Sequence, residues 1–461
     1  MNRYKILTSI FLLFIFLVIG YSQKHQPPEG GKPKDFRLPQ KQEFSLDNGL
    51  KVTMVPYGVV PKVTIQIKIR TGNLNEPPEE TWIADLTLDL LKEGTTTRDA
   101  AAIAEAAANM GGSISTSVSP EVSTISGEAL SEFGSDLIAL LADIIRNPAF
   151  PEKEFERLKK DYLRHLSIAK TQPQSLAQEK FLQVLYGDHP FGRVFPTEEM
   201  LFSYTIQKVK NFYKENFGAR RTHIYIAGIF DGKAMKKAIE EAFQDWNSGP
   251  EPLINIPKPT SQRKIYLIDR PGAPQSTLYI GLPVADPSLP EYMALQVTNT
   301  LLGGYFSSRI TANIREDKGY TYSPRSSITS YYRNAFWLQV ADVTTTVTGA
   351  SLKEIFYEIN RLQNEAPSLE ELRGVQNYMA GNFVLRNSSP TGIISQLAFM
   401  DFHGLGESFL TNYVKNIYAV TPENVQMVAQ QFLKEENMII VVVGDKKQIL
   451  EQLKPFGEVV L

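Results

Sequence analysis

The sequence predicts an α+β fold made of two homologous domains, in each of which one sheet packs against helices. Strand-like and helix-like segments come in groups with hairpin-like spacing, and this favours α+β sandwiches over regular strand–helix alternation. Signals of the first half also recur in the second: the helix-like run before Pro173 is echoed before Pro390 (390 − 173 = 217). A repeat period of this length indicates a duplicated domain and not a solenoid.

The first half opens with a hairpin over Phe44–Val55, whose turn is supplied by Asp47-Asn48-Gly49. Val63–Arg70 alternates apolar and polar residues, as a half-buried strand does. Two strands around Pro120 and a buried strand at His223–Ile229 complete the expected sheet. From apolar spacing and end signals we expect helices over Trp82–Lys92, Arg98–Met110, Phe133–Ile145, Glu152–Ala169, Ser175–Leu185, Thr205–Phe217 and Lys233–Trp246.

The second half repeats several of these signals. Thr421–Glu436 resembles Thr205–Asn216, and Ile440–Gly444 resembles Ile224–Gly228. The segment 247–262 holds four prolines and is the natural linker between the two copies. We therefore expect a signal peptide (1–22), a flexible leader (23–42), an N-terminal domain (43–246), a linker (247–262) and a C-terminal domain (263–461).

Composition excludes several classes of protein. Hydrophobic residues make up 43% of the 461-residue chain, and 48 basic residues nearly cancel 50 acidic ones. Without a basic excess, the chain lacks the electrostatic footprint of a nucleic-acid-binding protein. It contains no cysteine, which rules out disulfides, thiolate metal ligands and a lipid-modified N-terminal cysteine.

The first 22 residues have the pattern of an export signal. Arg3 and Lys5 precede the apolar run Ile6–Gly20, which is short for a membrane span, and small residues follow it. We predict a cleaved secretory signal and a periplasmic or secreted bacterial protein without stable membrane insertion. The alternative is that the segment is kept as an anchor.

The stretch 301–325 is the most informative part of the chain. Gly303-Gly304 permits a tight turn or a close backbone approach, and Ser308–Glu316 is compatible with a short helix. Lys318-Gly319 breaks that helix, and we expect a strand to begin at Tyr320-Thr321-Tyr322.

This layout puts Arg315 before a turn and Tyr322 after it, so that a guanidinium and a phenol could converge on one point. Both groups donate hydrogen bonds, and together they could hold a carbonyl oxygen that is gaining charge. Spacing alone favours a plainer alternative, in which the arginine ends a helix and the tyrosine belongs to the core.

The stretch resembles the C-terminal signature of the insulinase (pitrilysin) family of zinc metallopeptidases, the inverzincins. The matching elements are Gly303-Gly304, Ser307-Ser308-Arg309, Ile314-Arg315-Glu316, Lys318-Gly319 and Tyr322-Ser323. The resemblance covers both halves and implies that each packs a sheet against helices, the two facing each other like a clamshell. It also implies that Arg315 and Tyr322 bind the substrate.

In this family the first half carries an H-x-x-E-H zinc motif on a helix, with a later glutamate as third ligand. The recognisable flanks, such as Lys92-Glu-Gly-Thr95, place that motif on Asp85–Asp89. Asp85 and Asp89 stand at the histidine positions, Leu88 stands at the general-base position, and the alignment places His165 at the third ligand. Leu88 cannot accept a proton, so the base that activates water is missing.

The resemblance therefore implies a chain without a catalytic group, metal or other cofactor of its own. We expect the non-catalytic, substrate-binding subunit of a heterodimeric metallopeptidase, acting on a peptide, whose partner subunit bears the zinc. Two alternatives stay open. One is a peptide-binding or structural homologue with no turnover. The other is a metallopeptidase that binds an unusual metal through Asp85, Asp89 and His165, since carboxylates favour harder ions than zinc.

Overall fold

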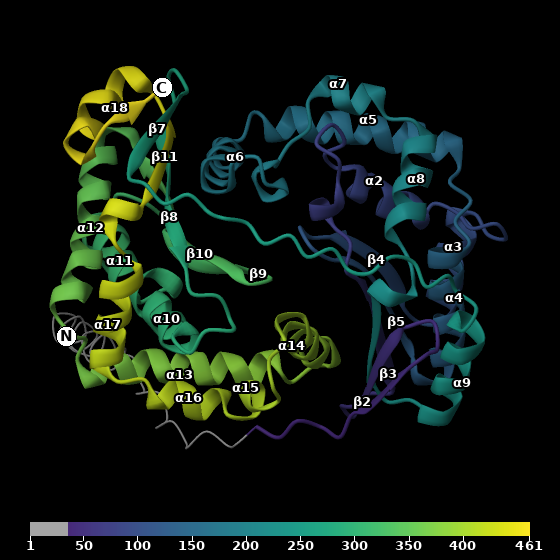
Figure 1. Cartoon of the computed structure of the whole chain (residues 1–461). Helices are drawn as coiled ribbons and strands as arrows, with labels where there is room; N and C mark the ends of the chain where they lie inside the picture. The colour runs from purple at the N-terminus through teal and green to yellow at the C-terminus, as the bar shows by residue number, and fades with distance from the viewer. Residues whose placement is uncertain (1–35) are drawn as a thin grey trace, which may run out of the picture. The chain divides into compact units, whose positions relative to one another are not determined.

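The computed structural model describes residues 36–461, and each half of this range builds one six-stranded sheet (Figure 1). The first sheet has the order β1-β2-β6-β3-β5-β4, in which only β2 and β6 pair in parallel. Its outermost strands are therefore β1 and β4. The strands are β1 (Gln42–Ser45), β2 (Lys51–Pro56), β3 (Lys62–Ile69), β4 (Ser113–Val118), β5 (Ser123–Leu130) and β6 (Thr222–Gly228).

The second sheet has the order β12-β7-β11-β8-β10-β9. Here β11 pairs in parallel with β7, as β12 does, and antiparallel with β8. Its strands are β7 (Lys264–Asp269), β8 (Gln275–Val284), β9 (Arg325–Tyr331), β10 (Asn334–Thr344), β11 (Ile439–Gly444) and β12 (Val459–Val460).

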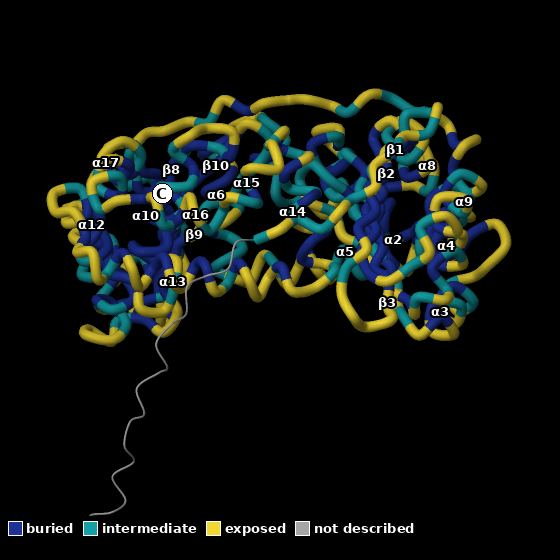
Figure 2. The backbone as a smooth tube through the Cα atoms, turned by 90° about the horizontal axis from the view of Figure 1, so that it is seen from below, coloured by how far each residue is buried: buried dark blue, intermediate teal, exposed yellow. Residues whose placement is uncertain are grey.

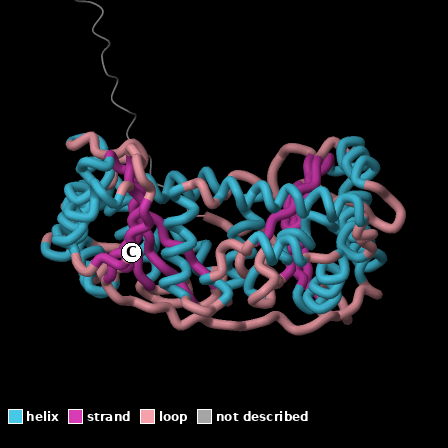
Figure 3. Tube along the Cα trace, turned by 90° about the horizontal axis from the view of Figure 1, so that it is seen from above, coloured by secondary structure: helices cyan, strands magenta, loops and turns pink. Residues whose placement is uncertain are grey.

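Helices flank both sheets, and Figure 3 shows the strands in two separate groups with helices beside each. Those of the first half are α2 (Ile83–Leu91), α3 (Ala100–Asn109), α4 (Gly134–Arg146), α5 (Glu152–Ala169), α6 (Pro173–Tyr186), α7 (Glu198–Ser203), α8 (Ile206–Asn216) and α9 (Gly232–Phe243). Those of the second half are α10 (Tyr292–Asn299), α11 (Arg309–Thr311), α12 (Thr348–Asn364), α13 (Leu369–Arg386), α14 (Pro390–His403), α15 (Ser408–Thr411), α16 (Tyr413–Ala419), α17 (Pro422–Phe432) and α18 (Lys446–Leu453).

Alternation along β3 decides which face of the first sheet the main core uses. Val63, Ile65, Ile67 and Ile69 are fully buried and belong to the largest apolar cluster, together with residues of α2, α4, α8 and α9. Because side chains alternate across a strand, the polar residues of β3 point to the opposite face. The buried residues accordingly concentrate along the strands in Figure 2.

The two halves exchange one helix each. Helix α6 lies between β5 and β6 of the first sheet in the chain but packs against β11 and β8 of the second. Helix α14 in turn packs against β6 and β3 of the first sheet. The two helices are 14 residues long and begin 217 residues apart, at Pro173 and Pro390, so they are copies of one element. The described residues 36–461 belong to a single compact unit, in keeping with this exchange.

The fold class and the sheet-on-helix arrangement of both halves confirm the prediction, and most elements lie within a few residues of their expected bounds. In the hairpin turn, Gly49 has φ +95°, a value that glycine adopts without strain. The segment between α9 and β7 contains neither helix nor strand.

One expected strand was wrong. Tyr320-Thr321-Tyr322 forms only a single bridge, from Thr321 to Val343, and β9 begins later, at Arg325. Pro324 explains the delay, because it has no N–H to donate to a strand ladder.

The expected signal (1–22) lies outside the described residues, as does most of the expected leader (23–42). Within residues 36–461, no helix combines the length and the hydropathy that crossing a bilayer requires.

Candidate functional site

Arg315 and Tyr322 are brought together by the structure. Arg315 lies on a π-helical segment, Ala312–Asp317, that continues α11, and Tyr322 lies in the loop before β9. The guanidinium carbon is 4.9 Å from the centre of the Tyr322 ring, a cation–π contact. Tyr322 is 79% exposed, so its hydroxyl is open to a ligand. The plainer alternative, a tyrosine in the core, is therefore wrong.

A third side chain, Phe306, also contacts the guanidinium. Phe306 is 60% exposed and its ring centre lies 4.4 Å from the Arg315 guanidinium carbon. Arg315 also pairs with the neighbouring carboxylate of Glu316 at 3.1 Å. Two aromatic contacts and one ion pair restrict the arginine to few rotamers, so less entropy is lost when it binds a ligand.

The segment that carries Arg315 is fastened to the helices behind it. The Asn313 amide donates to both Glu354 (3.0 Å) and Glu358 (2.8 Å) of α12. Arg309 makes a two-pronged pair with Glu371 of α13, both N···O distances being 2.7 Å. Such bidentate pairs are geometrically specific, so they fix how the segment sits on α12 and α13.

Gly303 shows why the double glycine precedes this segment. A Cβ at this position would lie 2.6 Å from the Ser326 hydroxyl and 2.8 Å from the Gln339 side-chain oxygen. No larger residue fits without moving those groups, which confirms the close backbone approach that the sequence indicates.

The positions expected from the zinc motif lie on α2. Leu88 is 1% exposed and forms part of the main core, so it contributes no polar atom. Asp85 accepts a hydrogen bond from the Asn73 amide at 2.7 Å. Asp89 accepts from the Tyr162 hydroxyl at 2.9 Å and pairs with Lys92 at 3.1 Å. Both carboxylates therefore already have protein partners.

His165 does not join them. It is exposed, its ring packs at 6.2 Å from that of Tyr162, and Tyr162 is the α5 residue that meets Asp89. Within residues 36–461, no group of three or more His, Cys, Asp or Glu side chains is placed to hold a metal ion. The residues present do not fit a zinc ion, and the alternative of an unusual metal on Asp85, Asp89 and His165 finds no support.

A buried carboxylate lies beside this helix. Burial, and then the neighbouring Asp85 charge, raise the pKa of Glu76 to about 8. Burial likewise raises the pKa of Asp85 to about 6. Glu76 accepts hydrogen bonds from the Ala84 backbone and the Asn73 amide, both at 3.0 Å, and so secures the start of α2. Within the part of the chain that the structure describes, these contacts give Glu76 a structural role.

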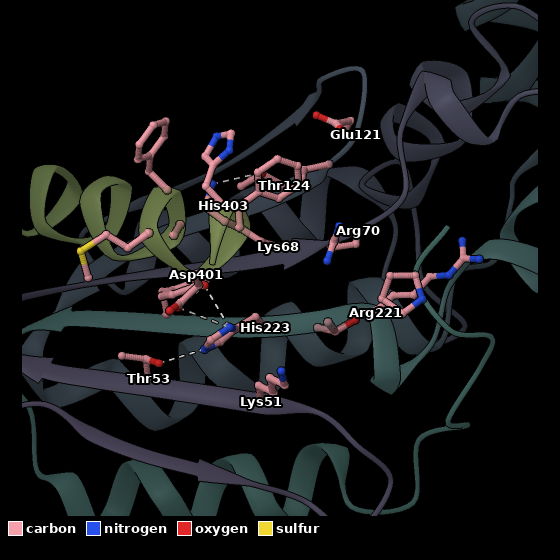
Figure 4. Close-up of a pocket in the computed structure, with 18 of the residues that line it drawn as sticks. Lys51, Thr53, Lys68, Arg70, Glu121, Thr124, Arg221, His223, Asp401 and His403 are labelled. Carbon is pink, nitrogen blue, oxygen red and sulfur yellow. Dashed lines mark hydrogen bonds and ion pairs between the residues drawn. The ribbon is translucent and has the colours of Figure 1, made fainter. Parts of the chain in front are cut away.

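A large cavity lies on the polar face of the first sheet, beneath α14 (Figure 4). Its volume is about 990 Å³. His223 of β6 lies in its wall, between Thr53 of β2 and Asp401 of α14 (Figure 4). The sequence indicated only a core or edge histidine at this position, because the residues around it come from three distant segments.

The hydrogen bonds around His223 fit a neutral ring whose proton is on Nδ1. The Tyr225 hydroxyl donates to Asp401 at 2.8 Å, so at 2.9 Å from His223 it must accept from Nδ1–H. The Thr53 hydroxyl, 2.9 Å from Nε2, then donates to that nitrogen. Burial, followed by the charges of Lys51 and Lys41, lowers the pKa of His223 to about 3, in keeping with a neutral ring. Since Thr53 is 1% exposed, this chain of bonds offers no accessible nucleophile.

Two models of one peptidase family match the chain. The model described as insulinase (peptidase family M16) matches residues 55–195, and the model described as peptidase M16 inactive domain matches residues 203–379. The chain belongs to the insulinase family. This confirms the family resemblance that the sequence shows in the stretch 301–325 and in the segments that flank Asp85–Asp89.

Relatives of the chain span nearly the same length. It is 24% identical to an uncharacterized zinc protease, YmxG, of Bacillus subtilis, over 86% of this chain and 96% of that one. It is 25% identical to an uncharacterized zinc protease of Rickettsia bellii, over 74% and 83% respectively.

Solved structures show the same fold. A peptidase M16 inactive domain from Pseudomonas fluorescens is similar with a TM-score of 0.81 and 24% identity, covering 88% of this chain and 98% of that one. A protease from Helicobacter pylori is similar with a TM-score of 0.82 and 17% identity, covering 88% and 100%.

Proposed function

We propose that this insulinase-family chain is the non-catalytic, substrate-binding subunit of a periplasmic, heterodimeric metallopeptidase. The observation that carries the proposal is a contrast within one chain. Arg315 and Tyr322 are in contact and accessible, whereas Asp85 and Asp89 are engaged by protein partners and Leu88 is buried. The match to a model described as an M16 inactive domain supports the same assignment. A zinc-bearing family member would be the partner.

In this assignment the chain binds and orients the peptide. The Tyr322 hydroxyl and the Arg315 guanidinium donate to the carbonyl oxygen of the bond to be cut, as negative charge builds on it. Donors held in place by Phe306 and by the contacts to α12 and α13 need little reorganisation when the substrate arrives.

The free edge of the first sheet supports a peptide-binding role. Strand β4 is outermost in the sheet, it lies beside α2, and its residues alternate between exposed and half-buried. An extended peptide could add to this edge through main-chain hydrogen bonds. This edge equally supports the alternative of a peptide-binding homologue without turnover, which the following experiment separates.

The test is the peptidase activity of the purified chain mixed with its zinc-bearing relative, with Tyr322→Phe compared to wild type. Losing one such donor costs about 2.7–4 kcal/mol of transition-state stabilisation, so we expect kcat to fall about 10²–10³-fold. Tyr357→Phe, which removes a hydroxyl from a residue that is 54% exposed on α12, is the matched control and should keep full activity.

Assembly is followed by size-exclusion chromatography and should be the same for all three proteins. Full activity of the Tyr322→Phe complex would show that the assigned role is wrong. A wild-type mixture that binds peptides without cutting them would instead favour the homologue without turnover.

A further inference from the structure

The cavity beneath α14 exists because α14 and α6 present different side chains to their sheets. On α6, Phe181 packs onto the backbone of Gly281: a Cβ there would lie 2.7 Å from the ring. The residue of α14 that matches Phe181 is Ala398 (398 − 181 = 217), and it lines the cavity. A small side chain on the helix therefore leaves space where the other copy is filled.

The residue of the sheet that lies beneath the helix also differs between the two copies. Gly281 pairs with Ile439 of β11, and Lys68 pairs with His223 of β6. Since Ile439 and His223 correspond (439 − 223 = 216), the counterpart of Gly281 is Lys68. At equivalent positions, therefore, the second sheet has a glycine and the first sheet has a lysine.

Lys68 belongs to a polar row that crosses the first sheet from its free edge. The strand registers align Ser117, Thr124, Lys68, His223 and Lys51 in that order, and all five line the cavity. Neighbours in such a row lie on one face of the sheet. Hydroxyl and ammonium donors therefore point into one space.

Positive charge is in excess on this wall. Among the residues that the structure describes, the one hydrogen bond of the Lys68 ammonium is to the Thr124 hydroxyl, at 3.5 Å. Arg70 stacks on Tyr332 and Phe402 at 5.2 and 5.1 Å. Neither makes an ion pair within residues 36–461. Charged residues that line the cavity are Lys51, Lys68, Arg70, Arg220 and Arg221 on the basic side and Glu43, Glu121 and Asp401 on the acidic side.

Each acidic residue of the lining also has a partner of its own within the protein. Glu43 pairs with Lys41 at 2.7 Å, and Asp401 accepts from Tyr225. The two carboxylate oxygens of Glu121 share the Tyr332 backbone N–H, at 3.2 and 3.0 Å. Burial raises the pKa of Glu121 to about 7, while the nearby charge of Arg70 acts in the opposite direction. Unpaired cations in a half-enclosed cavity are costly, so a bound anion would stabilise them.

We propose that this cavity binds carboxylate groups of an acidic peptide, with Lys68 and Arg70 as the contacts that recognise them. The proposal rests on the peptide-binding function above and names the chemical class of peptide that the chain prefers. A formal net charge of −2 argues against a general polyanion such as nucleic acid, because basic residues are not in excess over the whole chain.

The experiment measures direct binding to the full chain without its partner, by fluorescence anisotropy. The probes are a short fluorescein-labelled peptide rich in Glu and the same peptide with every Glu replaced by Gln. We expect the acidic peptide to bind wild type more tightly, and less so as salt is added. Lys68→Gln should weaken its binding about tenfold, since charge-assisted hydrogen bonds are among the strong ones.

Lys62→Gln is the matched control. It removes the same charge from the same strand, but Lys62 is exposed at the start of β3 and is not among the residues that line the cavity. Affinity for the acidic peptide should therefore stay at the wild-type value. Thermal unfolding of both variants checks that they fold alike.

Equal affinity for the two peptides, or unchanged affinity in Lys68→Gln, would overturn the proposal while leaving the Tyr322 result untouched. Inorganic phosphate tests whether the cavity binds a small free anion in place of a peptide carboxylate. If phosphate raises the melting temperature in a Lys68-dependent manner while the acidic peptide does not bind, the cavity holds a small free anion and the peptide assignment is wrong.

Discussion

Helix α6 packs tightly on the second sheet, whereas its copy, α14, leaves a cavity between itself and the first sheet. Under α6 the sheet presents Ile439, Val441 and Val443, and Phe181 fills the remaining space. Under α14 the corresponding strand presents His223 and Tyr225, and a cavity of about 990 Å³ remains. Both helices have 14 residues and equivalent places in the chain.

The difference shows how two copies of one fold can pack the same helix–sheet interface in different ways. An apolar interface can be packed completely, because no group needs a polar partner. A polar interface must give each buried group a partner or leave it near water, so it retains space. In this chain the second interface is an apolar cluster, and the first retains a cavity.

The largest expected effect comes from making the two interfaces alike. Phe181→Ala copies the small residue of α14 onto α6 and should lower the free energy of unfolding by about 3–5 kcal/mol, because it empties a packed site. The reverse change, Ala398→Phe, places a ring in an existing cavity and should alter stability by less than about 1 kcal/mol. Urea denaturation followed by tryptophan fluorescence measures both.

Ala398→Phe should also reduce binding of the acidic peptide, since the ring occupies the cavity. The comparison breaks if Ala398→Phe destabilises the chain as strongly as Phe181→Ala does, because the space beneath α14 would then not accommodate a ring.

The next largest effect is expected at Glu76, a buried carboxylate of the first half. The pKa of Glu76 is about 8 in the folded chain against 4.5 unfolded, so ionised Glu76 disfavours the folded state as pH rises from 4.5 to 8. Glu76→Gln should raise the free energy of unfolding by about 3–5 kcal/mol above that range and leave it unchanged below it. Urea midpoints measured across the range give the difference.

Glu79→Gln, in the exposed part of the same loop, serves as the control and should show no such pH dependence. A constant difference between Glu76→Gln and wild type at every pH would mean that the carboxylate does not titrate as described.

The smallest effect concerns the polar wall itself. His223→Ile introduces the residue type of the second sheet and removes the acceptor of the Thr53 hydroxyl. The Tyr225 hydroxyl keeps only its bond to Asp401. We expect a loss of about 1–3 kcal/mol at neutral pH. The loss should shrink and then reverse as pH falls from 6.5 towards 3. Wild type itself loses stability over this range, because its unfolded state takes up the His223 proton first.

Ile439→Val at the corresponding position of the second sheet should cost about 0.5–1.5 kcal/mol at every pH, since no titrating group is involved. If the two variants follow parallel pH profiles, His223 is not the titrating group and the polar wall is less buried than its contacts indicate.

Much of the fold was predictable because its signals are local. Hydrophobic alternation and the Asp47-Asn48-Gly49 turn define the first strands, and helix spacing gives α5 its observed bounds, Glu152–Ala169. The strand expected at Tyr320–Tyr322 was wrong because Pro324 and the contacts of the loop outweigh β propensity.

The candidate site was predictable only in part. Arg315 and Tyr322 lie close in the sequence and follow a recognisable pattern, so their proximity could be expected. Their assigned role in binding a carbonyl oxygen stays a prediction. Tyr162, and not His165, meets Asp89, because the rotation of α5 against α2 depends on packing that no spacing encodes.

The amino-acid sequence by itself indicated the duplication, the absence of an H-x-x-E-H motif and the presence of Arg315 and Tyr322 in the family's pattern, since each is a matter of residue identity at a position. Only the tertiary structure decided that α6 and α14 exchange sheets and that Lys68 and Arg70 face one cavity. The physical reason is that contacts between distant segments follow from the fit of whole surfaces, and a helix alone does not specify which sheet covers it.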